Sequence, residues 1–170
     1  MQKIRFSRGL LAALLTLALT ACGFQFRGVG KLPFESLYVQ NTGAPSIDRE
    51  LKRSLKSSGV RLESAPEQAE ASLDLMSETF EKKILSLSSA GKVKEYDVIY
   101  RVTFRMREAG SEVWGSPQTV ELHRDYTYSD TELLAKDYEE ARLAVDMHTD
   151  AVREIMRRVG SMKRQNAAPQ

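Results

Sequence analysis

The single cysteine of the chain, Cys22, has the most specific chemistry, because it ends the sequence Leu19-Thr20-Ala21-Cys22. This sequence has the form of a lipobox, where a bacterial lipoprotein precursor is cut before a cysteine that carries diacylglycerol on its sulfur. The small side chains of Thr20 and Ala21 fit such a peptidase. We therefore expect Cys22 to become the first residue, with no cofactor other than this covalent lipid. Several acyl chains would be needed, since one chain holds a protein on a membrane only marginally.

The segment before Cys22 predicts a lipoprotein signal peptide over residues 1–21. Lys3, Arg5 and Arg8 precede the apolar run 10–19, which is too short to cross a bilayer because a spanning helix needs about 20 apolar residues. An ordinary signal peptide with a coincidental cysteine, or an uncleaved anchor, is the alternative.

The residues after Cys22 predict an extended, lipid-anchored tether over 22–35, punctuated by Gly23, Gly28 and Pro33. Lipoproteins kept in the inner membrane typically have Asp directly after the cysteine. Gly23 stands there in this chain, so resemblance favours attachment to the cell outer membrane, on its periplasmic side.

A second candidate for chemistry is the trio Glu121, His123 and Asp125, which alternate onto one face of a predicted strand. Such a trio suits acid–base work or a metal ion, but a solvated sheet face is the preferred interpretation. The other histidine, His148, lies on an apolar helix stripe and is expected to be a core residue with one hydrogen bond. A metal site needs more converging ligands than these, and the sequence has no nucleophile elbow or phosphate loop. We expect no enzyme activity and no metal.

Basic residues gather in the middle of the chain and in its last helix. Arg and Lys pair well with phosphate oxygens, so this cluster indicates contact with a phosphorylated lipid; ordinary surface charge is the alternative. The candidates are Arg101 and Arg105, with Arg107, on one strand face, Lys92 and Lys94 beside a hairpin loop, Lys82 and Lys83 on the strand before it, and Lys136 in the helix.

Length and charge exclude several classes of protein. Removal of residues 1–21 leaves 149 residues, which suits one domain with a real core. The same removal takes away Lys3, Arg5 and Arg8, so the formal net charge falls from +2 to −1. Bulk charge therefore gives no argument for binding nucleic acid. With Cys22 lipidated, no disulfide is possible.

Periodicity predicts the order strand, helix, three strands, helix. Strands are expected at 36–40, 71–87, 95–107 and 113–128, with phase breaks near Met76 and near Ile84 that indicate bulges. A hairpin loop is expected at 88–92. The first helix should run from an N-cap at Ser46 to Gly59, with Ile47, Leu51 and Leu55 inward.

The last helix should start at a capping box over 129–132 and stop at Gly160, leaving a disordered tail at 161–170. Its apolar stripe is expected to lie against the sheet and comprises Leu134, Tyr138, Ala141, Val145, His148, Val152, Ile155 and Val159. Together these elements predict an α+β domain over 36–160, with two helices packed on one face of a four-stranded, mostly antiparallel sheet.

The mature start, Cys22-Gly23-Phe24-Gln25-Phe26-Arg27-Gly28, resembles the Cys-Gly-aromatic-x-hydrophobic-Arg-Gly start of the LPS-assembly lipoprotein LptE family. The likeness extends over the whole mature domain, although no single motif is very specific. It includes the capped helix ending at Gly59-Val60, Glu95-Tyr96 after the hairpin, and Leu134-Ala135-Lys136-Asp137.

This resemblance implies a function. Members of the family sit as a plug inside the LPS-assembly protein LptD, a large outer-membrane β-barrel, help it fold, and bind lipopolysaccharide for delivery to the cell surface. Lys136 matches a basic position implicated in lipopolysaccharide contact. A second basic position would fall near Ser89, where the nearest cations are Lys92 and Lys94.

Two other classes of function compete with this one. The first is another lipid-anchored accessory subunit of outer-membrane assembly machinery, or a peptidoglycan-associated binding module. The second is a lipid-anchored hydrolase that uses His123 and Asp125.

Overall fold

The computed structural model describes residues 32–129, 131 and 133–166. The predicted signal peptide, Cys22 and the predicted tether up to residue 31 lie outside this range, as do residues 167–170. Within it, no helix combines the length and the apolar character that crossing a membrane requires.

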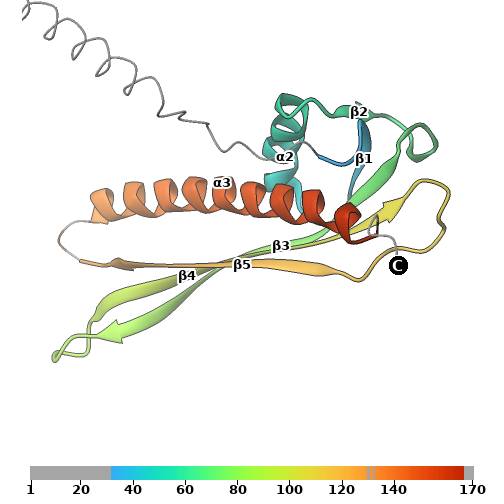
Figure 1. Ribbon diagram of the computed structural model, residues 1–170. Helices are drawn as coiled ribbons and strands as arrows, with labels where there is room; N and C mark the ends of the chain where they lie inside the picture. Colours follow the sequence, from blue (N-terminus) through green and yellow to red (C-terminus); the bar gives the residue numbers. More distant parts are fainter. Residues whose placement is uncertain (1–31, 130, 132, 167–170) are drawn as a thin grey trace, which may run out of the picture.

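Two helices lie on one face of a five-stranded mixed sheet (Figure 1). The helices are α2 (Pro45–Ser57) and α3 (Leu133–Asn166), and a short 3-10 turn, η1, spans Pro66–Gln68. The strand order is β2-β1-β3-β4-β5. The strands are β1 (Ser36–Asn41), β2 (Arg61–Glu63), β3 (Ala71–Leu87), β4 (Val93–Glu108) and β5 (Gln118–Thr127).

The predicted α+β class with two helices is confirmed, whereas the number of strands and their directions need correction. β1 pairs in parallel with both β2 and β3, while β3, β4 and β5 are antiparallel. A helix between β1 and the later strands makes the parallel pairing possible, because parallel neighbours need a long crossover. The missed strand, β2, has only three residues, too few to show any alternation.

The core lies between the helices and the inner face of the sheet. Alternate residues of β4 point inward, and Val98, Tyr100, Val102 and Phe104 are fully buried. They pack with the predicted inner residues of α2, which are Ile47, Leu51 and Leu55. The end of α2 is also as expected, since Gly59 has a φ of 85° and the Val60 amide donates to the Leu55 carbonyl at 3.1 Å.

A β-bulge in β3 changes which residues face the helices. The register with β4 shifts between Leu75 and Ser77, as the phase break near Met76 predicted, and again between Ile84 and Ser86. Leu75 faces the core before the first bulge, and Glu78 faces α2 and α3 after it. The bulge therefore brings a carboxylate into the layer between sheet and helices.

Glu78 corrects the prediction that Ser46 caps α2. The N-cap residue is Ala44, whose methyl side chain offers no acceptor. Instead, Glu78 Oε2 accepts hydrogen bonds from the amides of Ser46 and Ile47, at 3.0 and 3.4 Å. A carboxylate at this position satisfies orphan amides and suits the positive end of the helix dipole.

The predicted strand at 113–128 begins later than expected. Residues 113–117 form no strand, although the Gly115 amide donates to the Met106 carbonyl at 2.8 Å. β5 starts directly after Pro117 and forms an edge of the sheet, which is where proline is tolerated.

Helix α3 departs from prediction in its face and in its end. Its buried residues are Met147, Ala151, Val152, Ile155, Met156 and Val159, whereas Leu134, Tyr138 and Val145 are between 60% and 79% exposed. A stripe with 4,3 spacing drifts by about 20° per heptad on a straight helix, or about 70° between Leu134 and Val159, so a sheet covers only part of it.

Gly160 does not stop α3, which continues to Asn166 and overlaps the expected tail of 161–170. The expected capping box over 129–132 cannot be assigned, because residues 130 and 132 lie outside the described range. The helix itself begins at Leu133.

Candidate functional site

The β3–β4 hairpin loop and the start of α3 lie at the same end of the molecule, which we call the distal end (Figure 1). The loop is closed by the Ser88 amide, which donates to the Lys92 carbonyl at 2.7 Å, and Gly91 turns it with a φ of 74°. The Tyr128 amide donates to the Lys94 carbonyl at 2.8 Å, and the chain enters α3 five residues later. This geometry brings the predicted cations Lys92, Lys94 and Lys136 to one end.

The three distal lysines differ in their surroundings. Lys92 and Lys94 are exposed on the hairpin. Lys136 is 16% exposed in its side chain, and its Nζ lies 2.7 Å from Glu139 Oε2 within the same helix. Pairs of this kind stabilise a helix by only about 0.2–0.5 kcal/mol, so a phosphate group could replace Glu139 at little cost.

An aromatic cluster joins the hairpin to α3. The Tyr96 ring lies 5.8 Å from the Tyr126 ring and 5.2 Å from the Tyr128 ring, and Lys82 Nζ lies 4.9 Å above the Tyr96 ring. Lys82 Nζ also donates to Glu140 Oε2 at 2.7 Å, and the Tyr126 hydroxyl donates to the same oxygen at 2.5 Å. The cluster thus holds the base of the hairpin against the helix.

Ionisation in this cluster follows from its contacts. Burial opposes ionisation of Glu140, but the hydrogen bonds from Lys82 and Tyr126 outweigh it and lower the pKa of Glu140. The hydrogen bond to Glu140 raises the pKa of Lys82, and burial followed by the same carboxylate raises the pKa of Tyr126. The charge of Lys82 is therefore neutralised by Glu140 of α3.

Exposed apolar side chains surround the distal lysines in sequence. On β3 they are Phe80, Ile84, Leu85 and Leu87, between 41% and 58% exposed, and on the first turns of α3 they include Leu134 and Tyr138. Within the part of the chain that the structure describes, these side chains are not buried in the core. Exposed apolar residues gathered on neighbouring elements indicate a surface that another molecule covers.

The predicted strand-face arginines have partners of their own on the outer face. Arg101 pairs with Glu81 at 3.2 Å and also with Glu121. Arg105 lies 3.0 Å from Asp74, which is fully buried, and its guanidinium stacks 4.7 Å from the Trp114 ring. Neither residue lies at the distal end, since Arg101 is opposite Thr79 in the middle of β3 and Arg105 is opposite Asp74, near the start of β3.

The trio of Glu121, His123 and Asp125 lies on the exposed outer face, as the preferred interpretation predicted. His123 Nε2 lies 2.8 Å from Glu121 Oε1, and Nδ1 lies 3.3 Å from Asp97 Oδ2. These two carboxylates, Glu121 first, raise the pKa of His123. Across the residues that the structure describes, no group of three His, Cys, Asp or Glu side chains is placed to hold a metal ion.

His148 packs on the core as a partly buried residue. Its ring lies 4.8 Å from the Tyr100 ring, and its Nε2 lies 3.6 Å from Glu78 Oε1. The Tyr100 hydroxyl donates to the same oxygen at 2.5 Å, and burial is the first cause that raises the pKa of Tyr100. This cluster connects β3, β4, α2 and α3, so its role is structural.

Sequence reasoning missed the exposed part of the α3 stripe and the role of Lys82. The sequence does contain a signal for each. The predicted stripe is about seven turns long. Lys82 lies four positions after Glu78 in the same strand, an even number, so both side chains point toward the helices. In the distal cluster, Tyr126 is buried, whereas Tyr96 and Tyr128 are only partly buried.

A comparison with known proteins finds relatives of this domain. The family model described as "LptE: Lipopolysaccharide-assembly" matches residues 34–159, which span all five strands, all of α2 and α3 up to Val159. The LPS-assembly lipoprotein LptE of Pectobacterium atrosepticum is 24% identical over 154 residues, covering 88% of this chain and 83% of that protein.

Solved structures of lipoproteins share the fold. Lipoprotein B from Nitrosomonas europaea is 35% identical, with a TM-score of 0.73 over 83% of this chain and 92% of that one. The rare lipoprotein B from Shewanella oneidensis is 25% identical, with a TM-score of 0.68 over 77% of this chain and 99% of that one. Because the family model matches all five strands, α2 and most of α3, the chain belongs to the LptE family of lipopolysaccharide-assembly lipoproteins.

Proposed function

We propose that this chain is an outer-membrane lipoprotein that plugs and helps assemble the LptD β-barrel and binds lipopolysaccharide on its way to the cell surface. The observation that carries the proposal is the family match over residues 34–159, which covers the folded unit rather than a fragment of it. The family is one of assembly proteins, so no catalytic group is required. Lipidation at Cys22 would hold the domain on the periplasmic side of the membrane.

The exposed apolar side chains at the distal end support insertion into a partner. Leu134, Tyr138 and Val145 lie on one face of α3, and Ile84 and Leu87 lie on the projecting end of β3. Burying such side chains contributes about 1.5–3 kcal/mol each. A barrel lumen that surrounds the distal end would cover both elements at once.

Lipopolysaccharide combines phosphate groups with acyl chains, and the distal end offers a match for both. Lys92, Lys94 and Lys136 would meet phosphate oxygens, and the neighbouring apolar side chains would meet hydrocarbon. Arg101 and Arg105 remain secondary candidates, because neither lies at the distal end. We therefore place lipid contact at the three lysines first.

Affinity purification of the full-length protein from its native outer membrane tests the proposal. We expect a large β-barrel and lipopolysaccharide to co-purify, and we expect depletion of this protein to leave that barrel misassembled. Normal maturation of the barrel after depletion of this protein would contradict the proposal that it plugs and helps assemble the barrel. Capture of only peptidoglycan or of other assembly subunits would favour the competing classes.

A triple substitution tests the lipid contact separately. Lys92→Ala, Lys94→Ala and Lys136→Ala together should lower the amount of co-purified lipopolysaccharide while the barrel is retained. The matched control is Lys52→Ala, Arg53→Ala and Lys56→Ala, which removes the same charge from helix α2, outside the candidate lipid contacts. An equal loss of lipopolysaccharide in both triples would show that net charge, rather than the distal lysines, holds the lipid.

A further inference from the structure

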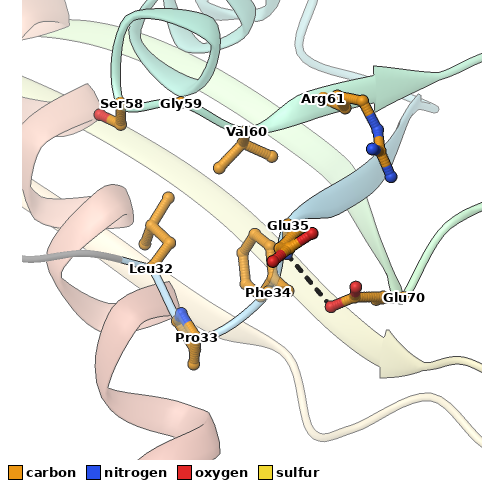
Figure 2. A pocket seen from close by; sticks show the side chains of 9 residues that line it. All are labelled: Leu32, Pro33, Phe34, Glu35, Ser58, Gly59, Val60, Arg61 and Glu70. Atoms are coloured by element: carbon orange, nitrogen blue, oxygen red, sulfur yellow. Dashed lines mark hydrogen bonds between the residues drawn. The ribbon is translucent and has the colours of Figure 1, made fainter.

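A pocket of about 630 Å³ opens where the chain enters the domain (Figure 2). This volume lies within the range of about 300–1,000 Å³ that small-molecule sites occupy. Its apolar side chains are Leu32, Pro33, Phe34 and Val60, and Figure 2 shows Leu32 and Glu70 on opposite sides of the view, with Phe34 and Glu35 between them. Ser58 and Gly59 place the pocket at the C-terminal end of α2, and Figure 1 shows α2 well away from the β3–β4 hairpin loop.

The polar rim of this pocket is negative. The Glu70 carboxylate is held in place, because its Oε2 accepts a hydrogen bond from the Glu35 amide at 3.1 Å and the Glu70 amide donates to Ser36 Oγ at 3.1 Å. Among the described residues, neither Glu35 nor Glu70 has an ion-pair partner. The one cation of the rim, Arg61, lies 3.4 Å from Glu63. The rim thus presents two carboxylates that are free to take a cation.

The chain directly before Leu32 has the complementary chemistry. Residues 22–31 read Cys-Gly-Phe-Gln-Phe-Arg-Gly-Val-Gly-Lys, with two phenylalanines and two cations and no acidic residue. We propose that this part of the tether folds back into the pocket, with Phe26 against Val60 and Phe34 and with Arg27 against Glu35 and Glu70.

Chain length and backbone freedom allow this arrangement. Residue 26 is six positions from Leu32, and an extended chain covers at most about 3.6 Å per residue, so Phe26 reaches up to about 20 Å from the pocket wall. Gly28 and Gly30 lie between them and can adopt the positive φ values that a reversal needs. A short flexible linker gives an effective concentration in the millimolar range, so even weak contacts would be populated.

Docking would fix the height of the domain above the membrane, a consequence that rests on the proposed lipid at Cys22. Nine residues separate Cys22 from Leu32 and span about 30 Å when extended. With Phe26 docked, only three residues remain, spanning about 10 Å. The α2 end of the domain would then be held close to the bilayer, and the distal end would point away from it.

Disulfide trapping in cells that express the full-length protein tests the docking. The pair Phe26→Cys and Ser58→Cys places one thiol in the tether and one in the pocket wall, and trypsin separates them into different peptides. We expect this pair to link several-fold more than the control pair Phe26→Cys and Arg53→Cys, whose second position lies on α2 outside the pocket. Equal linking in the two pairs would overturn the proposal.

Charge variants sharpen the result. Glu35→Gln with Glu70→Gln should lower linking of the first pair to the control level, and so should Arg27→Gln, whereas Glu67→Gln should leave it unchanged. A link from Ser58→Cys to a cysteine at Asn166, in place of the tether link, would show that the C-terminal residues fill the pocket and would also overturn the proposal. The single variant Ser58→Cys reports on the anchor independently, since a link to Cys22 itself requires an unlipidated thiol.

Discussion

Glu78 in β3 caps helix α2, because its Oε2 accepts a hydrogen bond from the backbone amide of Ser46 at 3.0 Å. The other oxygen of the carboxylate accepts the hydroxyl of Tyr100 at 2.5 Å. One side chain thus joins the sheet, the start of one helix and the buried tyrosine that packs on the other helix. The joint exists because the bulge after Leu75 turns Glu78 toward the helices.

Replacing Glu78 with Ala should destabilise the domain. The variant loses the cap and leaves the Tyr100 hydroxyl without its acceptor, so we expect the free energy of unfolding to fall by about 2–4 kcal/mol. Urea unfolding followed by circular dichroism measures the change. Ser46→Ala is the matched control, since the Ser46 side chain does not cap the helix; a loss in Ser46→Ala as large as in Glu78→Ala would contradict the assignment of the cap.

Replacing Arg105 with Met should lower the stability of the domain rather than its binding of lipid. Asp74 is fully buried and would keep only the Thr42 hydroxyl, at 2.9 Å, as its polar side-chain partner in the described chain. Breaking a buried pair typically costs about 3–5 kcal/mol, and the partial exposure of Arg105 places the expected loss at the lower end of this range. Thermal unfolding measures it, and fluorescence of Trp114, the only tryptophan, reports the lost stacking.

The double variant Asp74→Asn and Arg105→Met provides the control for that experiment. It removes the unpaired charge and should recover much of the stability. If Arg105→Met alone lowered co-purified lipopolysaccharide at unchanged stability, Arg105 would be a lipid contact rather than a structural residue.

His123 should make stability depend on pH near neutrality. Its pKa is raised in the folded protein by Glu121 and then Asp97, so the folded state binds the proton more tightly than the unfolded state. This contribution is complete below the unfolded pKa of about 6.5 and is lost as the pH rises through the higher folded value. The advantage of the native protein over His123→Gln should therefore shrink between about pH 6 and pH 8 in urea unfolding. Parallel curves for the two proteins would argue against the coupling.

The parts of the fold that sequence could predict are those set by local patterns. The alternation of β4, the Gly59 cap and the β3 bulges depend on neighbouring residues, and all are present. Glu78 as the cap of α2 could not be predicted, because the partners are separated by 32 positions in sequence. At the candidate site, the basic residues were identified, but the paired state of Arg101 and Arg105 depends on cross-strand register, which the sequence does not reveal.

The face of α3 offers a test that separates folding from partner binding. Ile155 is fully buried, so Ile155→Ala should lower the free energy of unfolding by about 2–5 kcal/mol. Leu134→Ser and Val145→Ser lie on the exposed part of the stripe and should each change it by no more than about 0.5 kcal/mol. If the stripe had lain wholly against the sheet, all three substitutions would be comparably destabilising.

The proposed insertion into a barrel gives the two serine variants a second test. Although stable, they should recover less of the barrel partner in affinity purification than Arg142→Ser, which removes an exposed side chain from the same helix. Undiminished recovery would show that this part of α3 is not covered by the partner.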